Sequence, residues 1–248
     1  NGSPLSHEQL RDFVRDGFLV LNPTVPGGDE FHKMAYEQAE RIVGSGEVGN
    51  NFLSEEVSPP GFLDEILDAP EVVGALTGLL GEDYTVQPHR HCHIAKEGSP
   101  GQNLHQDDFF GFDRFRQLVP TDLMLFYYPQ TVTEDMGPTA IVPGSQYSRR
   151  SRAPEPDSGV DWVPAGPQQP ERTMVTHRPG CIMLMHWHLW HRGTKQLGGS
   201  AVPIRYAFKL QFRRSRPFLP PPAILSEARA LGNPFAPPSQ HPQPGPAA

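Results

Sequence analysis

The sequence predicts a mainly β protein, folded as a sandwich or barrel of the jelly-roll type, with α-helices at its flanks. In the first third of the chain, apolar residues recur at helical spacing, whereas the remainder alternates short apolar runs with turn signals. The 29 prolines and 24 glycines favour turns and short strands over long helices. With 248 residues, the chain is long enough to build one large domain around a sizeable core.

Three helices are expected near the start of the chain. Ser6 is placed to cap the first, with Gln9 three residues later and apolar residues at helical spacing behind it. The second is expected over residues 29–43, where apolar side chains gather on or near one face. The third covers about residues 68–80, with Pro70 in its first turn.

Apolar runs bounded by prolines, glycines and polar clusters predict the strands of the fold. They lie at residues 18–21, 85–95, 122–128, 139–142, 173–176, 181–185 and 204–212. Strands at this spacing, separated by turn signals, are typical of sandwiches and barrels.

We expect a single domain over residues 1–233, with a helical part at 5–81 and a jelly-roll core at about 85–214. Residues 149–170 combine prolines with charged and polar side chains, which indicates a long loop beside the site and a candidate lid. Residues 234–248 are rich in proline and are expected to form a disordered tail.

The composition argues against several classes of partner. The net charge is −7 and no basic stripe is present, which argues against a nucleic-acid partner. No apolar run approaches the roughly 20 residues of a membrane span, and no signal peptide opens the given sequence.

The two cysteines bear on the cellular compartment. Cys92 and Cys181 could form one disulfide, but a chain of this size does not need a disulfide for stability. We therefore expect a protein of a reducing, cytoplasmic compartment.

The candidate functional residues begin with His105 and Asp107. Because they are two positions apart in an extended segment, their side chains point the same way. A histidine from a distant strand would complete a set of two imidazoles and one carboxylate on one face of a metal ion. Such a set leaves three coordination positions open, as a non-haem Fe(II) oxygenase requires. Three clustered histidines are candidates for this third ligand: His186, His188 and His191.

Two further features admit more than one interpretation. His89, His91 and His93 alternate, so on a strand they would share one face and could bind a metal, line a pocket mouth or face solvent. Arg205 lies in an apolar strand, where a buried cation requires an anionic partner. That partner is either a dicarboxylate cosubstrate, bound bidentately, or an acidic side chain of a neighbouring strand.

Several motifs, taken together and in this order, resemble the phytanoyl-CoA dioxygenase family of Fe(II)/2-oxoglutarate-dependent oxygenases. They are Leu5-Ser6-x-Glu8-Gln9 with Asp16-Gly17-Phe18, then His105-Gln106-Asp107, Gly137-Pro138 with Val142-Pro143-Gly144-Ser145, and Trp190-His191-Arg192-Gly193 with Arg205. The resemblance covers roughly residues 5–214 and implies a double-stranded β-helix core.

The resemblance also implies a set of site residues and cofactors. The implied iron ligands are His105, Asp107 and His191. By the same resemblance, Arg205 anchors the distal carboxylate of 2-oxoglutarate, Gln106 lies beside this cosubstrate, and Lys96 lies in the region that lines the pocket. Fe(II), 2-oxoglutarate and O₂ would be required, and ascorbate is expected to stimulate such an enzyme.

The chain departs from the family's pattern at three places. Gln146 stands where the family's Pro-Gly-Ser is followed by a histidine. The segment between His191 and Arg205 is a few residues longer than expected, and Cys181 stands where an acidic residue often follows the glycine. None of these departures removes an implied metal ligand.

The substrate, expected to be a small molecule, is left open by the sequence. Phe109 and Phe110 follow the metal motif and could form an aromatic wall for an apolar substrate, or pack in the core. Cys92 is another candidate for substrate contact, and Arg149 could meet an anionic group or remain solvated. The carboxylate of Asp107 favours hydroxylation, desaturation or ring formation over halogenation. The alternatives are a cupin-like metal enzyme without 2-oxoglutarate and a non-catalytic binding protein on the same fold.

Overall fold

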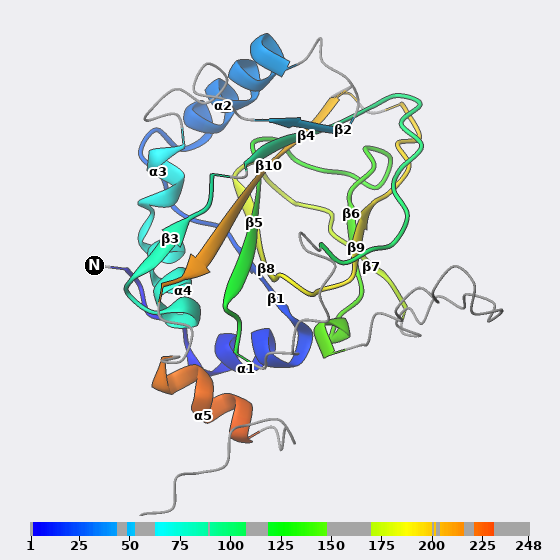
Figure 1. Cartoon of the computed structure of the whole chain (residues 1–248). Helices are drawn as coiled ribbons and strands as arrows, with labels where there is room; N and C mark the ends of the chain where they lie inside the picture. Colours follow the sequence, from blue (N-terminus) through cyan, green and yellow to red (C-terminus); the bar gives the residue numbers. More distant parts are fainter. Residues whose placement is uncertain are drawn as a thin grey trace, which may run out of the picture.

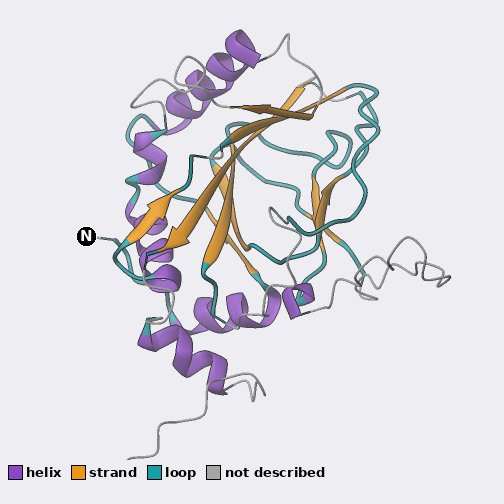
Figure 2. Cartoon of the chain, viewed as in Figure 1, coloured by secondary structure: helices purple, strands orange, loops and turns teal. Residues whose placement is uncertain are grey.

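In the computed structural model, a larger and a smaller antiparallel β-sheet lie side by side, and helices cover the outer side of the larger sheet (Figure 1; Figure 2). The structure describes residues 2–43, 49–52, 63–88, 90–107, 119–147, 170–199, 201, 204–215 and 221–230. This arrangement confirms the predicted jelly roll with flanking helices. The predicted loop at 149–170, except its last residue, and the predicted tail at 234–248 lie outside the described residues.

The helices of the described ranges begin and end largely where local signals place them. Their bounds are α1 His7–Asp16, α2 Gly28–Val43, α3 Asp64–Leu67, α4 Pro70–Leu80 and α5 Pro222–Ala230. The expected cap of α1 is confirmed, because Ser6 Oγ accepts from Gln9 N at 3.1 Å and Gln9 Oε1 accepts from Ser6 N at 2.9 Å. Helices α3 and α5 were not predicted. The latter packs against α1, where Glu227 lies 3.0 Å from His7 Nδ1.

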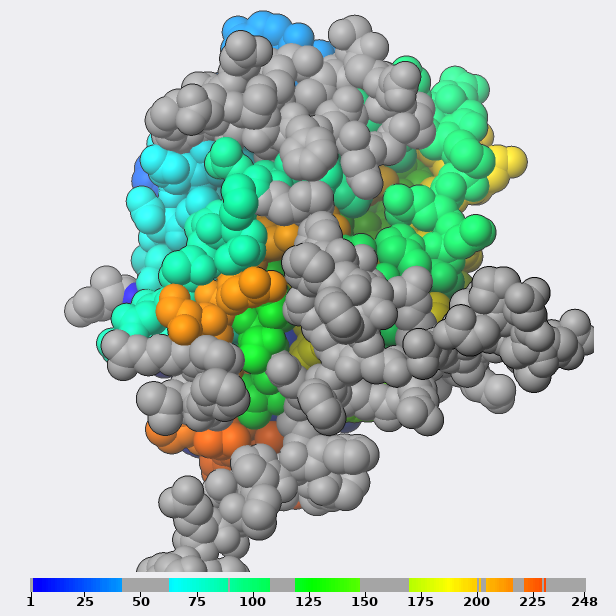
Figure 3. Space-filling model, viewed as in Figure 1, coloured from blue at the N-terminus to red at the C-terminus, as the bar shows by residue number. Residues whose placement is uncertain are grey.

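The larger sheet has seven strands in the order β1-β8-β5-β10-β4-β2, with β3 paired to the far end of β10. Their bounds are β1 Phe18–Leu21, β2 Gly49–Phe52, β3 Tyr84–Val86, β4 His91–Lys96, β5 Asp122–Tyr128, β8 Cys181–His186 and β10 Ile204–Arg214. The strand expected at 85–95 is thus two strands, which pair with different halves of β10. Pro88 lies between them and lacks the N–H that a continuous ladder needs. Figure 3 shows β3 beside the end of β10 on the molecular surface.

The smaller sheet has the order β7-β6-β9. Its strands are β6 Thr139–Ile141, β7 Arg172–Thr173 and β9 His191–Gly193. Strand β7 is shorter than the strand expected at 173–176 and begins one residue earlier. Strand β9 was not predicted, and neither was β2 of the larger sheet.

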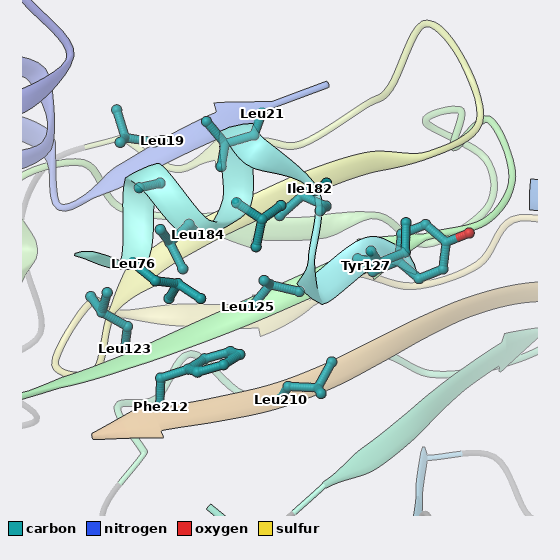
Figure 4. Close-up of a cluster of buried hydrophobic side chains, with 14 of the residues drawn as sticks. Leu19, Leu21, Leu76, Leu123, Leu125, Tyr127, Ile182, Leu184, Leu210 and Phe212 are labelled. Atoms are coloured by element: carbon teal, nitrogen blue, oxygen red, sulfur yellow. The ribbon is translucent and has the colours of Figure 1, made fainter. Parts of the chain in front are cut away.

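Alternation along the strands divides the core into two layers. On the outer face of the larger sheet, Leu125 packs in one cluster with Leu76 of α4 (Figure 4). On the inner face, Phe126 and Ala207 pack in a second cluster that includes Ile141 of the smaller sheet. Because β5 is buried on both faces, its sequence shows no alternation between apolar and polar residues.

The sheet order also decides the question of the disulfide. Cys92 lies on β4 and Cys181 on β8, and β5 and β10 run between them. At about 4.8 Å per strand, they are roughly 14 Å apart along the sheet, well beyond the reach of a disulfide. A bond between them is therefore excluded. None of the helices in the described ranges has the length and apolar character that a bilayer span requires.

Candidate metal centre

His105 and His191 are brought together by the backbone. The His105 N–H donates to the His191 carbonyl at 3.0 Å, and the His191 N–H donates to the His105 carbonyl at 2.9 Å. In such an antiparallel pair, directly opposite residues place their side chains on the same face. The two imidazole rings therefore lie together, with ring centroids 4.5 Å apart.

Asp107 completes the group. Its Oδ1 lies 3.6 Å from His105 Nε2 and 3.9 Å from His191 Nε2. Each of the three residues offers one donor atom, and these atoms lie within 4.8 Å of one another. Within the described residues, this is the only group of three or more such side chains that could hold a metal ion.

The protonation of the two histidines suits a metal site. His105 Nδ1 lies 2.7 Å from the Asn103 carbonyl, and His191 Nδ1 lies 3.0 Å from the Leu189 carbonyl. Because a carbonyl only accepts hydrogen bonds, each Nδ1 carries a proton, and Nε2 is the ring nitrogen that faces the metal group. Burial lowers the pKa of His191 to about 4, so this ring is neutral near pH 7. Metal-binding histidines are commonly oriented in this way.

Lys209 contacts the same carboxylate from the other side. Its Nζ donates to Asp107 Oδ2, and its side chain is only 7% exposed. Burial opposes ionisation of Asp107, but Lys209, His191 and His105 together outweigh it and hold the pKa of its carboxyl below the ordinary value. The sequence analysis missed Lys209. The argument that singled out Arg205, a cation within an apolar strand, applies equally to Lys209 because both lie on β10.

Arg205 lies in a pocket next to the metal group. A cavity of about 220 Å³ is lined by this arginine, by residues of β4 and the loop after it, including Gln102, and by Gly193 of β9, the strand that also carries His191. Arg205 is 4% exposed, and among the described residues its Nε has no hydrogen-bond partner and its guanidinium no acidic one. Its pairing with a carboxylate of a neighbouring strand, one of the two alternatives, therefore finds no support in the described part of the chain.

Gly193 keeps the pocket open beside Arg205. A Cβ at this position would lie 3.3 Å from Gln102 Oε1 and 3.9 Å from Arg205 Nη2. Gln102 Oε1 in turn accepts from the Gly193 N–H at 2.9 Å. Hydrogen bonds thus fix this part of the lining, and the guanidinium of Arg205, which has no acidic partner among the described residues, faces a space that a small carboxylate can enter.

The other candidate histidines lie outside the metal group. His186 is buried and its ring stacks on Phe13 at 6.5 Å, on the side of α1. His188 lies next to it, and its carbonyl accepts from Gln106 Nε2 at 2.5 Å. Of the three clustered histidines, the structure brings His191 alone to His105 and Asp107.

His91 and His93 lie on the inner face of β4, opposite Lys209 and Ala207 of β10. Their rings are 6.1 Å apart, and burial lowers the pKa of His93 far below its ordinary value. Neither belongs to the metal group: His91 is buried, whereas His93 is half-buried and lines the pocket that contains Arg205. His89 falls outside the described residues.

Cys92 and Lys96 lie on the face of β4 opposite to His93. Cys92 is fully buried in the core layer between the larger sheet and the helices, where burial raises the pKa of its thiol to about 12. Lys96 shares that strand face by alternation. The structure therefore does not bring these two predicted pocket residues to the metal group. Phe109, Phe110 and Arg149, the other predicted substrate contacts, lie outside the described residues.

The comparisons with known proteins agree with this geometry. A family model described as Phytanoyl-CoA dioxygenase (PhyH) matches residues 13–201. No curated protein matches the chain.

Solved structures share the fold at low sequence identity. The carbocyclase SnoK from nogalamycin biosynthesis, titled non-heme and alpha-ketoglutarate dependent, is 17% identical with a TM-score of 0.62, over 86% of this chain and 88% of that one. The epimerase SnoN in complex with Fe3+, alpha ketoglutarate and nogalamycin RO is 15% identical with a TM-score of 0.63, over 84% and 83%. AviO1 from Streptomyces viridochromogenes Tue57 is 15% identical with a TM-score of 0.59, over 87% and 97%. At these identities, the likeness establishes the fold.

Proposed function

The chain belongs to the phytanoyl-CoA dioxygenase family, and we propose that it is an iron(II)- and 2-oxoglutarate-dependent oxygenase that oxidises a small organic molecule. The observation that carries this proposal is the convergence of His105, Asp107 and His191, with both Nε2 atoms turned toward the carboxylate. Two imidazoles and one carboxylate on one face suit Fe(II) and leave positions open for small molecules.

The residues present fit both groups. Iron(II) with bound 2-oxoglutarate would supply the oxidising chemistry, in which decarboxylation of the cosubstrate to succinate and CO₂ is coupled to activation of O₂ and oxidation of the substrate. His105 and His191 would bind the metal through Nε2, because the Nδ1 proton of each ring is held in a hydrogen bond to a backbone carbonyl. Asp107 would contribute the negative charge that offsets part of the metal's charge.

Arg205 would bind the distal carboxylate of 2-oxoglutarate. Its guanidinium is buried, and a bidentate pair with a carboxylate supplies the anion that a buried cation requires. Because the arginine side chain is only 4% exposed, the ion pair would form largely out of contact with water, which strengthens it. Gln106 remains a candidate neighbour of the cosubstrate.

The carboxylate of Asp107 would occupy the position at which a halide binds, which favours hydroxylation, desaturation or ring formation over halogenation; of these reactions we propose hydroxylation. The solved neighbours include a carbocyclase and an epimerase, so ring formation and epimerisation are the outcomes to be distinguished from it by product analysis. A small-molecule substrate is part of the proposal, and SnoN with bound nogalamycin RO is an example on this fold. Phe109, Phe110 and Arg149 stay predicted contacts of that substrate.

An anaerobic titration tests the proposal. Purified protein is loaded with one equivalent of Fe(II) and titrated with 2-oxoglutarate, while the weak visible charge-transfer band of the chelate is recorded. We expect a saturable band, followed by slow release of succinate when O₂ is admitted. If iron is demonstrably bound and no band develops, the cosubstrate assignment is wrong, and the cupin-like metal enzyme without 2-oxoglutarate becomes the better description.

A further inference from the structure

The two oxygens of Asp107 have different neighbours. Oδ1 faces the Nε2 atoms of His105 and His191, whereas Oδ2 accepts a hydrogen bond from Lys209 Nζ. The carboxylate therefore lies between the prospective metal position and a buried ammonium group. Each oxygen of the carboxylate thus has its own neighbours even without a bound metal ion.

Lys209 is fixed in this position. It lies on β10 with its side chain on the inner face, opposite His91 of β4, and 7% of that side chain is exposed. Its Nζ lies 6.0 Å from the centroid of the Phe126 ring, an arrangement that favours a cation over the aromatic face. Among the described residues, Asp107 is its only acidic partner. A buried ammonium does not give up such a partner readily, because leaving it unpaired is costly.

Phe126 connects this cation with the metal group. Its ring lies 6.3 Å from the ring of His191 and 5.7 Å from that of His93, edge to face in both cases. Lys209 thus lies within the packed wall of the site, and it cannot swing out to solvent without disturbing that wall.

We propose that Lys209 is a positioning residue that holds Asp107 as a one-oxygen ligand and so keeps one coordination position of the metal open. This inference rests on the proposed function. A carboxylate can bind a metal through one or both oxygens. Two imidazoles, one oxygen of Asp107 and the two donor oxygens of a chelating 2-oxoglutarate would occupy five of the six positions of the metal ion. If Oδ2 were released, it could fill the sixth.

Nitric oxide probes that sixth position independently of turnover. Protein loaded with Fe(II) and 2-oxoglutarate is titrated anaerobically with nitric oxide, and the electron paramagnetic resonance signal of the adduct is measured per bound iron. We expect a strong signal in the wild type. Lys209→Met lacks the donor to Oδ2. In this variant we expect nitric oxide to bind at least about tenfold more weakly, a loss typical of removing the partner of a metal ligand.

Two further variants make the test decisive. Lys209→Arg retains a charged donor and should recover most of the signal. Arg213→Met removes another cation of β10, one that pairs with Asp122 outside the metal group, and should match the wild type. If Lys209→Met binds iron and nitric oxide as the wild type does, Lys209 has a structural role only and the inference is overturned. Loss of the signal in Lys209→Arg as well would also overturn it.

The outcomes separate this inference from the proposed function. If the wild type binds iron but shows no chelate band with 2-oxoglutarate, the proposed function fails. If the wild type gives both the chelate band and the nitric oxide signal while Lys209→Met gives both equally, only the role of Lys209 fails.

Discussion

Arg205 and Lys209 extend from the same face of β10, so that one strand supplies both the cation that lines the pocket and the cation that contacts Asp107. The two cations have different environments. Lys209 has a carboxylate partner within the described chain, whereas Arg205 has none. In the proposed function, Lys209 therefore pairs with the proposed metal ligand Asp107, and Arg205 is available to bind an incoming anion.

The first prediction concerns Arg205. We expect Arg205→Met to raise the dissociation constant for 2-oxoglutarate about 100-fold, because the variant loses a buried, charge-assisted pair with a carboxylate. Titration of the chelate band measures this constant. Iron affinity should stay within about threefold of the wild-type value, since the metal ligands are untouched. An unchanged constant for 2-oxoglutarate would show that the cosubstrate binds elsewhere.

The second prediction identifies the third ligand. We expect His191→Ala to weaken Fe(II) binding at least about 100-fold, measured by competition with a chelator, because one of three protein ligands is lost. His188→Ala is the matched control, since His188 lies three residues away and outside the metal group. This control should bind iron nearly as the wild type does. A reversal of the two results would mean that His188 is the ligand.

The third prediction concerns pH and a histidine far from the metal group. His32 Nδ1 lies 2.9 Å from Tyr127 Oη, and burial lowers the pKa of His32 below its ordinary value of 6.5. Below about pH 6.5 the unfolded chain takes up a proton at His32 that the folded protein does not, so the free energy of unfolding falls as the pH falls. At neutral pH this group causes no such loss.

Urea unfolding of metal-free protein between pH 7.5 and 5 checks this prediction. His32→Gln removes the titrating group and should show a shallower decline in the free energy of unfolding than the wild type. The other histidines contribute equally to both proteins, so the difference isolates His32. Parallel declines would show that His32 takes up a proton in the folded state as readily as in the unfolded chain.

The fourth prediction tests the cap of α1. Ser6→Ala should lower the free energy of unfolding by about 1 kcal/mol, because the N–H of Gln9 loses its acceptor at the start of the helix. Ser226→Ala, at an exposed position within α5, should change it by less than about 0.5 kcal/mol. Chemical denaturation of the two variants measures both values. Equal effects would show that the reciprocal bonds of the cap add no stability.

Local features of the sequence predicted much of the fold. The cap at Ser6, the proline at the start of α4 and the apolar runs of β5 and β8 act over a few residues, and the structure confirms each of these elements. Helix α5 was missed because it depends on packing against α1. Strand β2 was missed because its polar sequence carries no strand signal and it forms by pairing with β4.

The faces of the strands were harder to predict. Alternation showed that Cys92 and His93 point in opposite directions, but it did not say which direction leads to the site. Both faces of β4 are covered: one lies against the core beneath the helices, and the other lines the pocket together with Gly193 of the smaller sheet. Where both sides are covered, the polarity of the side chains no longer distinguishes inside from outside.

The sequence by itself determined the residue types of the candidate site, the extended spacing of His105 and Asp107, and the resemblance to a family. Only the tertiary structure decided that His191, rather than its two neighbours, faces them, and that Lys209 contacts the same carboxylate. These contacts join residues far apart in the chain. The contacts are determined by strand register and sheet order, which depend on the packing of the whole core. A local sequence pattern does not contain that information.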